Sequence, residues 1–523
     1  MSRVLWIGCV LIALSAAVGA QGDDWPMWGG SPARNMVSRE KNLPASADPG
    51  KPASEGGPID PATTKNVRWV AKIGSAAYGN PVVAGGRVYV GTNNGSPRLA
   101  KYQGDYSVLM VFDEKDGHFL WQLTVPKLEA GKVSDWEQVG LCSSPVIEGD
   151  RAYVITNRCE VLCLEVHGLQ GADKGPFTDE AQYVAGIGKP PIAQGAGDAD
   201  IIWRYDMYND LGIFPHNMTS SSPLLIGDKL FITTSNGVDW TNKHTPAPDA
   251  PALICLDKNS GKLLAVERSG ISQRTYFSNW SSPAYGIIKG QPTVVFGGGD
   301  GFCYGFDANS LGPIPTETLA PDAPPAVPGL KELWRCDCNP PSRRSKNGKP
   351  IKYGDNNGPS EIIATPVIDG DRVYVGVGQE PESGEGIGAL ACIEPKGSGD
   401  VTQTGKVWTY EKIGRSVSTV SISDGLLYTG EFTGIVTCLD VKTGEPLWTH
   451  DAEAHIWGST LLADGKIYVG NESGILTILA AGREKKVLGT VDFKDPIYST
   501  PVAANGAVYV ATGSNLYALE SKP

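Results

Sequence analysis

The chain has 523 residues, of which 41% are hydrophobic, and its 45 Lys and Arg against 57 Asp and Glu give a formal net charge of −12. This length suffices to bury a large core and corresponds to several ordinary domains, unless the chain consists of repeats. The acidic balance argues against a general nucleic-acid-binding protein, because such proteins carry a basic surface. Basic residues do cluster between Arg343 and Lys352, where we favour a solvated loop.

The first twenty residues have the composition of an export signal. Arg3 precedes an apolar run from Leu5 to Val18, and the small residues at 18–20 suit cleavage before Gln21. A short membrane anchor is the alternative, but this run and every later one are shorter than the roughly 18 apolar residues of a spanning helix. We therefore expect a signal peptide over 1–20, an N-terminal arm over 21–65, and a periplasmic or secreted protein.

One pattern recurs eight times in the rest of the chain. A small polar residue, often followed by Pro, precedes two apolar residues, a Gly/Asp turn and an alternating apolar strand, as in Thr365-PVIDGDRVYVG. Alternation with period two and a turn rich in Gly, Asp and Asn predict a β-hairpin. The copies begin at Asn80, Ser144, Ser222, Ser282, Thr365, Thr419, Ser459 and Thr500.

A third and a fourth strand follow most hairpins. In Cys438-Leu-Asp440, Thr443-Gly444 and Trp448, an acidic residue ends the third strand, a glycine makes the next turn, and a tryptophan marks the fourth strand. Short polar side chains bond the N–H groups of a following turn, so we expect structural roles for these Asp and Thr residues. The fourth strand lacks its Trp at 264–266 and 487–489, where weaker packing between neighbouring units is expected.

Four strands repeated about every 40 residues predict a β-propeller, with a solenoid as the alternative. The last copy ends at Leu519 without a fourth strand, whereas an unpaired strand with a Trp, residues 67–70, precedes the first copy. Adding the early strand to the last unit closes a ring and removes exposed sheet edges. We predict an all-β protein with a single eight-bladed propeller of four-stranded antiparallel blades over residues 66–523.

Cysteines fall into two groups. One cysteine occupies the same third-strand position in each of four repeats, which indicates small buried apolar residues. Cys336-Asp-Cys338 and the Cys159–Cys163 pair are candidates for metal binding or a redox pair, but a disulfide between residues two apart would be strained. The repeat-position cysteines are Cys163, Cys255, Cys392 and Cys438.

The repeat resembles the pyrroloquinoline quinone (PQQ) repeat family, which includes eight-bladed quinoprotein dehydrogenases and the propeller lipoprotein of the outer-membrane barrel-assembly machinery. The resemblance covers Trp25 to Leu519. The opening Asp24-Trp-Pro-Met-Trp28-Gly-Gly and the segment 358–366 are similar to secreted PQQ-like propellers of planctomycete-type bacteria. The resemblance implies the fold, while the repeat Trp and Gly residues dock blades and do not bind the quinone. Such dehydrogenases commonly stack the quinone on a disulfide between adjacent cysteines, and this chain has no Cys-Cys pair.

Residues just before each first strand should surround one mouth of the central channel. Their side chains are unusually polar and aromatic for a set chosen by position alone, although channel mouths are wet in any propeller. The candidate metal ligands are Glu361, Asn217 and Asn279, as oxygen donors to Ca²⁺. The ligand-binding candidates are Tyr78, His216, Asn217, Asn279, Trp280, Glu361, Arg415, His455, Trp457 and Tyr498.

Long Gly/Pro/Ala-rich stretches interrupt the early repeats at 168–200, 238–251, 311–330 and 336–360. Loops of such length are uncommon unless they serve a function or are disordered. We expect one elaborated side of the ring and a protein or carbohydrate partner bound through the insertions 168–200 and 336–360.

Three functions remain open at this point. An extracytoplasmic binding or interaction scaffold is favoured. A quinoprotein-like alcohol or sugar dehydrogenase is the alternative, with PQQ and Ca²⁺ as cofactors, Arg415 at the quinone and Glu361 as metal ligand or base. A lyase or hydrolase using His216, His455 and Glu361 is the third. No sequence motif identifies catalytic residues.

Overall fold

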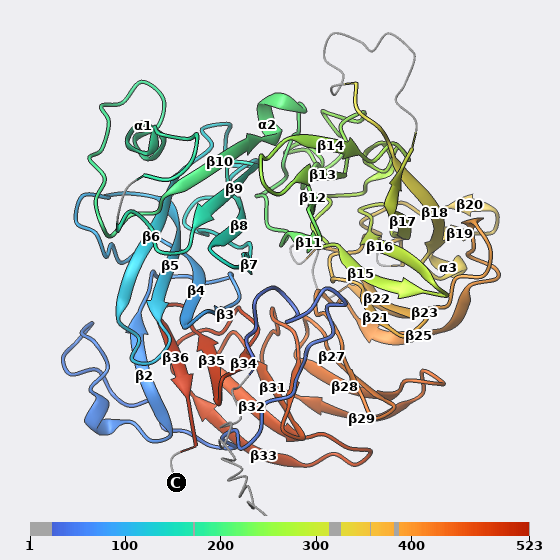
Figure 1. Cartoon of the computed structure of the whole chain (residues 1–523). Coiled ribbons are helices and arrows are strands. Elements are labelled where there is room, and N and C mark those ends of the chain that lie inside the picture. Colours follow the sequence, from blue (N-terminus) through green and yellow to red (C-terminus); the bar gives the residue numbers. More distant parts are fainter. Residues whose placement is uncertain (1–22, 171–172, 313–325, 356, 381–385, 522–523) are drawn as a thin grey trace, which may run out of the picture.

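Eight antiparallel sheets, one from each sequence copy, form a closed ring (Figure 1). The computed structural model describes residues 23–170, 173–312, 326–355, 357–380 and 386–521. The predicted all-β, eight-bladed propeller with four-stranded antiparallel blades is confirmed. The predicted signal peptide, residues 1–20, lies outside the described residues. Among the described residues, no helix is long and apolar enough to cross a membrane.

Blades 1–4 are numbered in chain order, and the first strand of each is the innermost. Blade 4 gains a fifth, parallel strand, β24 (Gly399–Asp400), on its outer edge. The strands are β3 (Val82–Ala84), β4 (Arg87–Asn93), β5 (Tyr106–Asp113) and β6 (Phe119–Pro126); β7 (Val146–Glu148), β8 (Arg151–Thr156), β9 (Glu160–Glu165) and β10 (Ile201–Asp206); β11 (Leu224–Ile226), β12 (Lys229–Thr233), β13 (Leu253–Asp257) and β14 (Leu263–Val266); and β15 (Ala284–Ile288), β16 (Gln291–Gly297), β17 (Phe302–Leu311) and β18 (Leu330–Asp337).

Blades 5–8 have shorter connections. Blade 7 gains the parallel strand β1 (Val37–Ser38) on its inner edge. The strands are β21 (Val367–Asp369), β22 (Arg372–Gly378), β23 (Ile387–Ile393) and β25 (Lys406–Gly414); β26 (Ser421–Ser423), β27 (Leu426–Gly430), β28 (Ile435–Asp440) and β29 (Pro446–Asp451); β30 (Leu461–Ala463), β31 (Lys466–Gly470), β32 (Ile475–Ala480) and β33 (Val487–Asp492); and β34 (Val502–Ala504), β35 (Ala507–Ala511), β36 (Asn515–Leu519) and β2 (Val67–Lys72).

The ring closes through β2, as predicted. This early strand pairs antiparallel with β36, and Trp69 lies opposite Ala518 (Figure 1, where blue β2 lies beside red β36). Every blade then has its four antiparallel strands, so no blade of the ring lacks its outer strand. Closure joins residues about 450 positions apart, which Arg68 reinforces by an ion pair with Glu520 at 3.0 Å.

Neighbouring blades dock through the repeat tryptophan. The indole N–H of Trp408 in blade 5 donates to the carbonyl of Val441 in blade 6 at 3.1 Å. Gly444, with φ +74°, lies against the same indole, where a Cβ would come within 2.6 Å of the ring. The turn glycine is therefore required both by its left-handed backbone and by this contact. Equivalent indole–carbonyl bonds join Trp69 to Glu114, Trp121 to Val166, Trp203 to Lys258, and Trp448 to Gly482.

Blade 7 replaces its missing tryptophan with the N-terminal arm. Gly489 occupies the position opposite Ile478 that Trp448 occupies opposite Cys438 in blade 6. The backbone of Ala45 fills the space, since a Cβ on Gly489 would lie 2.4 Å from its carbonyl oxygen. The sequence predicts weaker packing here because the repeat tryptophan is missing. The arm is not part of the repeat, so the pattern gives no sign of its contact with Gly489.

The N-terminal segment 24–40, which we call the plug, crosses one face of the ring. Its residues bond the first strand of every blade or the residue before it, and Trp25 and Trp28 are both buried. The innermost strands have N–H and C=O groups without a neighbouring strand, and the plug forms hydrogen bonds with part of these groups. The bonds are Trp25–Val83, Pro26–Ile147, Arg34–Pro223, Pro32–Tyr285, Ala33–Ile368, Asn35–Ile422, Met36–Leu462 and Ser38–Ala503, in the order of blades 1 to 8.

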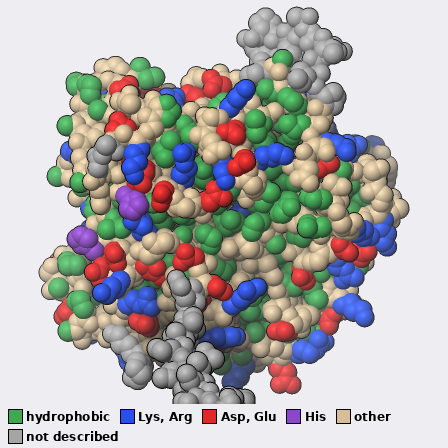
Figure 2. All heavy atoms as spheres, in the orientation of Figure 1, with side chains coloured by type: hydrophobic (Ala, Val, Ile, Leu, Met, Phe, Trp, Pro, Cys, Tyr) green, Lys and Arg blue, Asp and Glu red, His purple; other side chains and the backbone are tan. Residues whose placement is uncertain are grey.

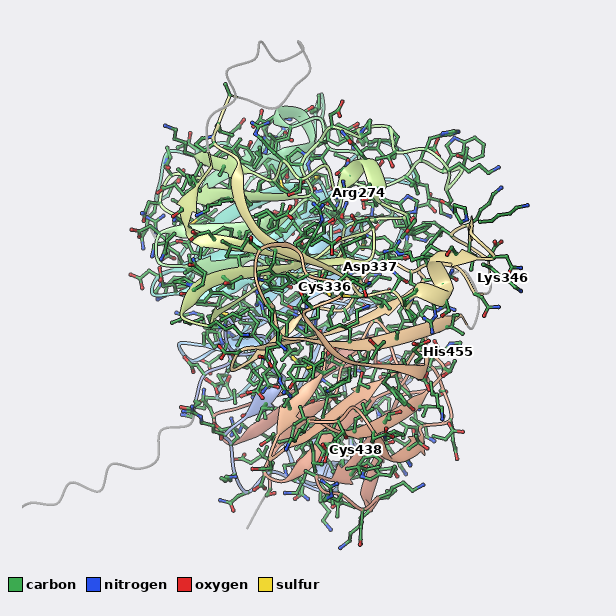
Figure 3. All side chains as sticks on the ribbon, turned by 90° about the vertical axis from the view of Figure 1, so that its right-hand side faces the viewer. Arg274, Cys336, Asp337, Lys346, Cys438 and His455 are labelled. Atoms are coloured by element: carbon green, nitrogen blue, oxygen red, sulfur yellow. The ribbon has the colours of Figure 1, made fainter. Side chains whose placement is uncertain are left out.

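The two insertions expected to meet a partner lie at different blades of the ring. The 168–200 insertion, with α1 (Glu180–Ala185), runs along the outer edge of β6, where the N–H of Gln122 donates to Gly197. The 336–360 insertion lies between β18 of blade 4 and β21 of blade 5 and holds α3 (Pro341–Arg344) and the hairpin β19 (Ser345–Lys346) with β20 (Lys349–Pro350). Figure 3 shows Lys346 and His455 on the same side of the molecule. The remaining helices are η1 (Pro61–Thr63), α2 (Met207–Asp210) and η2 (Ser272–Arg274).

The four repeat-position cysteines are fully buried and form no disulfide, as predicted. Cys336 and Cys338 are also buried and free, and Cys336 faces Cys303 across β17 and β18. Burial raises the pKa of the repeat-position thiols, for example to about 12 for Cys255. They pack as small apolar groups inside the blades (Figure 3).

Candidate functional site

A cavity of about 420 Å³ occupies the channel beyond the plug. Trp28 of the plug lines it, so this side chain forms the end of the cavity at the plugged face. Most of the other lining residues come from the connections into the first strands, including Tyr78, Trp280 and Trp457. Figure 2 shows acidic and basic side chains interspersed over the face that carries the plug.

The small polar residue that opens each sequence copy belongs to a ring around this cavity. The N–H of Thr419 donates to Oγ of Ser459, and the N–H of Ser459 donates to Oγ1 of Thr500, both at 2.8 Å. The ring then passes from the N–H of Thr500 to Oδ1 of Asn80 at 2.7 Å. These residues therefore join consecutive blades, and seven of the eight opening residues also line the cavity: Asn80, Ser222, Ser282, Thr365, Thr419, Ser459 and Thr500.

Aromatic side chains form one wall. The rings of Tyr78 and Tyr498 stack with centroids 4.6 Å apart, and the Trp457 indole meets both edge-on at 6.0 and 6.2 Å. Burial raises the pKa of both tyrosines, so their hydroxyls are neutral donors at ordinary pH. Trp136 and Trp280 line other parts of the same cavity.

Glu472 positions Trp457 and His455. Its carboxylate accepts the indole N–H of Trp457 at 3.0 Å and lies 2.9 Å from Nδ1 of His455. The His455 ring stacks on Phe432 with centroids 4.3 Å apart. His455 thus supports the aromatic wall from behind and is not one of the cavity-lining residues.

His216 is also absent from the lining. Its side chain is only 2% exposed, and Nδ1 donates to the carbonyl of Val238 at 2.6 Å. Burial lowers the pKa of His216, so the ring is held neutral. Its backbone carbonyl accepts the indole N–H of Trp280, which fixes that indole at the cavity.

The two predicted amide ligands, Asn217 and Asn279, have different environments. Asn217 lines the cavity from a left-handed backbone, φ +57°. Asn279 is fully buried, its amide N–H donates to Asn236 and its oxygen accepts the N–H of Gly299 at 2.9 Å. Asn279 therefore holds loop backbone together.

Glu361 and Arg415 form a buried polar cluster beside the cavity. Tyr353 donates to Oε1 of Glu361 at 3.1 Å, while Oε2 has no hydrogen-bond partner among the described residues. Complete burial raises the pKa of Glu361 to about 8, with the nearby Glu380 adding to the shift. Arg415 donates from Nη1 to the carbonyl of Glu380 and lies over the Phe432 ring, 5.1 Å from its centroid.

The described lining contains one charged side chain, Glu380, and no Lys or Arg. PQQ carries three carboxylates, which require cationic or N–H partners in a buried site. The residues present do not fit that cofactor in this cavity. The predicted calcium ligands do not fit either, because Asn279 is committed to backbone and Glu361 lies outside the lining.

Sequence positions identified five lining residues and missed several others. Tyr78, Asn217, Trp280, Trp457 and Tyr498 are in the cavity as expected. Three of the missed side chains are Trp28, Trp136 and Glu380. Trp28 belongs to the plug, where no repeat assigns a position, Glu380 follows β22, and Trp136 lies ten residues before β7, outside the positions just before a first strand.

Solved structures and one family model resemble the chain. No curated protein matches the chain. The chain is similar in structure to BamB from Moraxella catarrhalis, at 14% identity and a TM-score of 0.48, covering 87% of this chain and 98% of that one. It is similar to the computationally designed Ika8 protein at 10% identity and a TM-score of 0.50, covering 87% and 99%. A europium-containing methanol dehydrogenase matches at 12% identity and a TM-score of 0.44, covering 94% and 89%.

A family model described as outer membrane protein assembly factor BamB matches residues 60–262, 346–450 and 432–522. These segments include strands of seven of the eight blades and together cover more than half of the chain. The four antiparallel strands of blade 4 and the last strand of blade 3, β14, lie outside them. The chain therefore belongs to this PQQ-like propeller family.

Proposed function

We propose that the protein is an extracytoplasmic binding propeller whose channel cavity takes a sugar unit of a carbohydrate partner. The observation that carries this is the makeup of a cavity closed at one end by Trp28: indole and phenol rings on the walls, a ring of hydroxyl and amide groups, and one carboxylate. Ligand sites are typically concave, largely aromatic or apolar, and carry a few placed polar groups.

Sugar rings present apolar C–H faces and polar hydroxyl edges. Tyr498 and Trp457 offer ring surfaces for the former, and Glu380 is an acceptor for the latter. A neutral ligand also avoids the unfavourable burial of a charge without an opposite partner. Export of the chain, on which the extracytoplasmic location depends, is part of this proposal.

The catalytic alternatives have less support from the same geometry. A lyase or hydrolase built on His216, His455 and Glu361 needs these groups around one substrate, yet none of the three lines the cavity. The quinoprotein alternative places Arg415 on the quinone, whereas its Nη1 bonds the backbone of Glu380. Fold likeness does not decide between these activities.

The test is a glycan array with the purified protein, followed by calorimetric titration of any glycan that binds. We expect saturable binding that weakens at least about tenfold in Trp457→Ala, since a buried aromatic anchor contributes over 1 kcal/mol. Trp240→Ala is the matched control because Trp240 is 79% exposed and is not a lining residue. The absence of any glycan ligand, equal loss in both variants, or saturable binding of PQQ with Ca²⁺ that Trp457→Ala loses would overturn the proposal.

A further inference from the structure

Three carboxylates meet where the 168–200 insertion leaves β9 and returns to β10 of blade 2. This insertion contributes no lining residue to the channel cavity. Asp173 lies shortly after β9, Glu180 opens α1, and Asp200 immediately precedes β10. One oxygen from each carboxylate lies within 4.8 Å of the corresponding oxygens of the other two. The beginning, middle and end of the insertion thus converge on one point, at the upper left of Figure 1 where α1 is drawn.

Asp200 gives independent evidence that this cluster binds a further group. Its side chain is fully buried, and Oδ1 has no hydrogen-bond partner among the described residues. Oδ2 accepts only the backbone N–H of Lys174, at 3.1 Å. A buried carboxylate oxygen without a partner is costly, so native proteins normally supply a donor, a water or a metal ion.

No side-chain cation of the described chain fills that role. Lys174 donates its backbone N–H to Asp200, but its ammonium pairs with Glu165 at 3.0 Å and is 60% exposed. Glu180, which is 6% exposed, accepts the N–H of Ile201 at 3.2 Å and has no ion pair. Three close carboxylates without a cation repel one another unless a proton or a metal ion is shared.

We propose that Asp173, Glu180 and Asp200 form a Ca²⁺ site that fastens the 168–200 insertion to blade 2. Carboxylate and backbone oxygens are the ligands Ca²⁺ prefers, and a partly exposed member such as Asp173 leaves room for water in its coordination shell. Mg²⁺ binds less well here because it requires near-ideal octahedral geometry and loses its water reluctantly.

A bound ion would stabilise more than its own loop. The insertion covers the outer edge of β6 through Gly197 and Ala199, and Asp198 holds Lys101 and Tyr102 of blade 1 at 2.5 and 2.7 Å. Fixing both ends of the insertion therefore secures a contact between blades 1 and 2. This site is independent of the cavity and of the carbohydrate proposal.

The experiment is calorimetric titration of the chelator-treated full-length mature protein with Ca²⁺, beside a thermal melt and limited proteolysis. We expect one Ca²⁺ per chain with a Kd of about 10⁻⁴–10⁻³ M, the range of extracellular modules, with weaker Mg²⁺ binding. Ca²⁺ should raise Tm and slow cleavage within 168–200, because a ligand of the native state stabilises it.

Asp200→Asn and Glu180→Gln should each weaken Ca²⁺ binding at least about tenfold, since both keep the side-chain shape and lose charge. Glu484→Gln, at an exposed position in blade 7, is the charge-loss control and should bind as the wild type. Two results would overturn the proposal: no Ca²⁺ binding by the folded wild type, which means that the carboxylates share a proton, or binding that both variants retain.

Discussion

The indole N–H of Trp28 donates to Oγ1 of Thr365, 2.9 Å away and 337 positions later in the chain. This bond joins the plug to the residue that opens blade 5, and both side chains line the cavity. The floor of the candidate site is thus built by the N-terminal segment, and its position depends on a contact with the ring. Stability of the plug and integrity of the cavity should be coupled.

Trp28→Phe keeps an aromatic floor and removes this bond. We expect it to lower the free energy of unfolding by about 1 kcal/mol, the usual net value of one hydrogen bond, and Trp28→Ala to lower it by about 3–5 kcal/mol through a new cavity. Denaturant unfolding measures both. In a double-mutant cycle, Trp28→Phe and Thr365→Val should be non-additive, and strictly additive effects would show that the bond contributes nothing.

Arg34 should be the least replaceable residue of the plug. Its guanidinium is fully buried and donates to three carbonyls, those of Pro283, Pro223 and Trp28. Arg34→Met leaves these acceptors unsatisfied at about 1–3 kcal/mol each, so we expect failure to fold stably or a large fall in Tm. Arg39→Met, at an exposed position of the same segment, should leave Tm unchanged. Equal melting of the two variants would contradict the assigned role.

Substitutions at two glycines can distinguish the cost of left-handed backbone strain from the loss of blade docking. Gly444→Ala forces a Cβ at φ +74° and within 2.6 Å of the Trp408 indole, while Gly465→Ala forces one at φ +66° into open space. Left-handed strain costs about 1–2 kcal/mol in both, and only Gly444→Ala also displaces the indole. We expect Gly444→Ala to have clearly the lower Tm. Indistinguishable melting curves would mean that the Trp–Gly contact adds nothing to blade docking.

The blade count and the ring closure followed from local signals. Period-two alternation and the turn residues predict each hairpin. Trp69 identifies β2 as a fourth strand that has no blade of its own at the start of the chain. Packing between blades repeats as well, so the Trp–Gly docking could be anticipated from the spacing of Trp408 and Gly444. These features are encoded within one repeat length.

The plug and the lining residues outside the repeat pattern could not be predicted from signals within one repeat. Nothing periodic links Trp28 to Thr365 or Ala45 to Gly489, because the N-terminal segment has no repeat to set its register. The segment before each first strand is irregular, so its sequence predicts which residues lie near the channel but not which side chains face the cavity. The side chains of His216 and Glu361 are near the channel but are buried in the protein.

Glu361 should make stability depend on pH. Burial raises its folded-state pKa to about 8, above the ordinary value near 4.3, so folding favours the protonated acid. Its contribution is fully present below about pH 4 and is lost as the pH rises toward 8, by at most about 5 kcal/mol. Among the described residues, the titratable groups that interact with it include Tyr353, Glu380, Arg415 and Tyr276.

Glu361→Gln mimics the protonated acid and keeps an acceptor for the Tyr353 hydroxyl. Compared with the wild type, the variant should gain relative stability between pH 5 and 8 and show a flatter dependence of unfolding free energy on pH. Denaturant unfolding at several pH values measures this difference. Glu484→Gln is the control, because Glu484 is an exposed carboxylate in blade 7 away from the cluster. Parallel pH profiles for wild type and Glu361→Gln would show that the carboxyl is ionised in the folded protein and that the cluster with Arg415 acts as an ion pair.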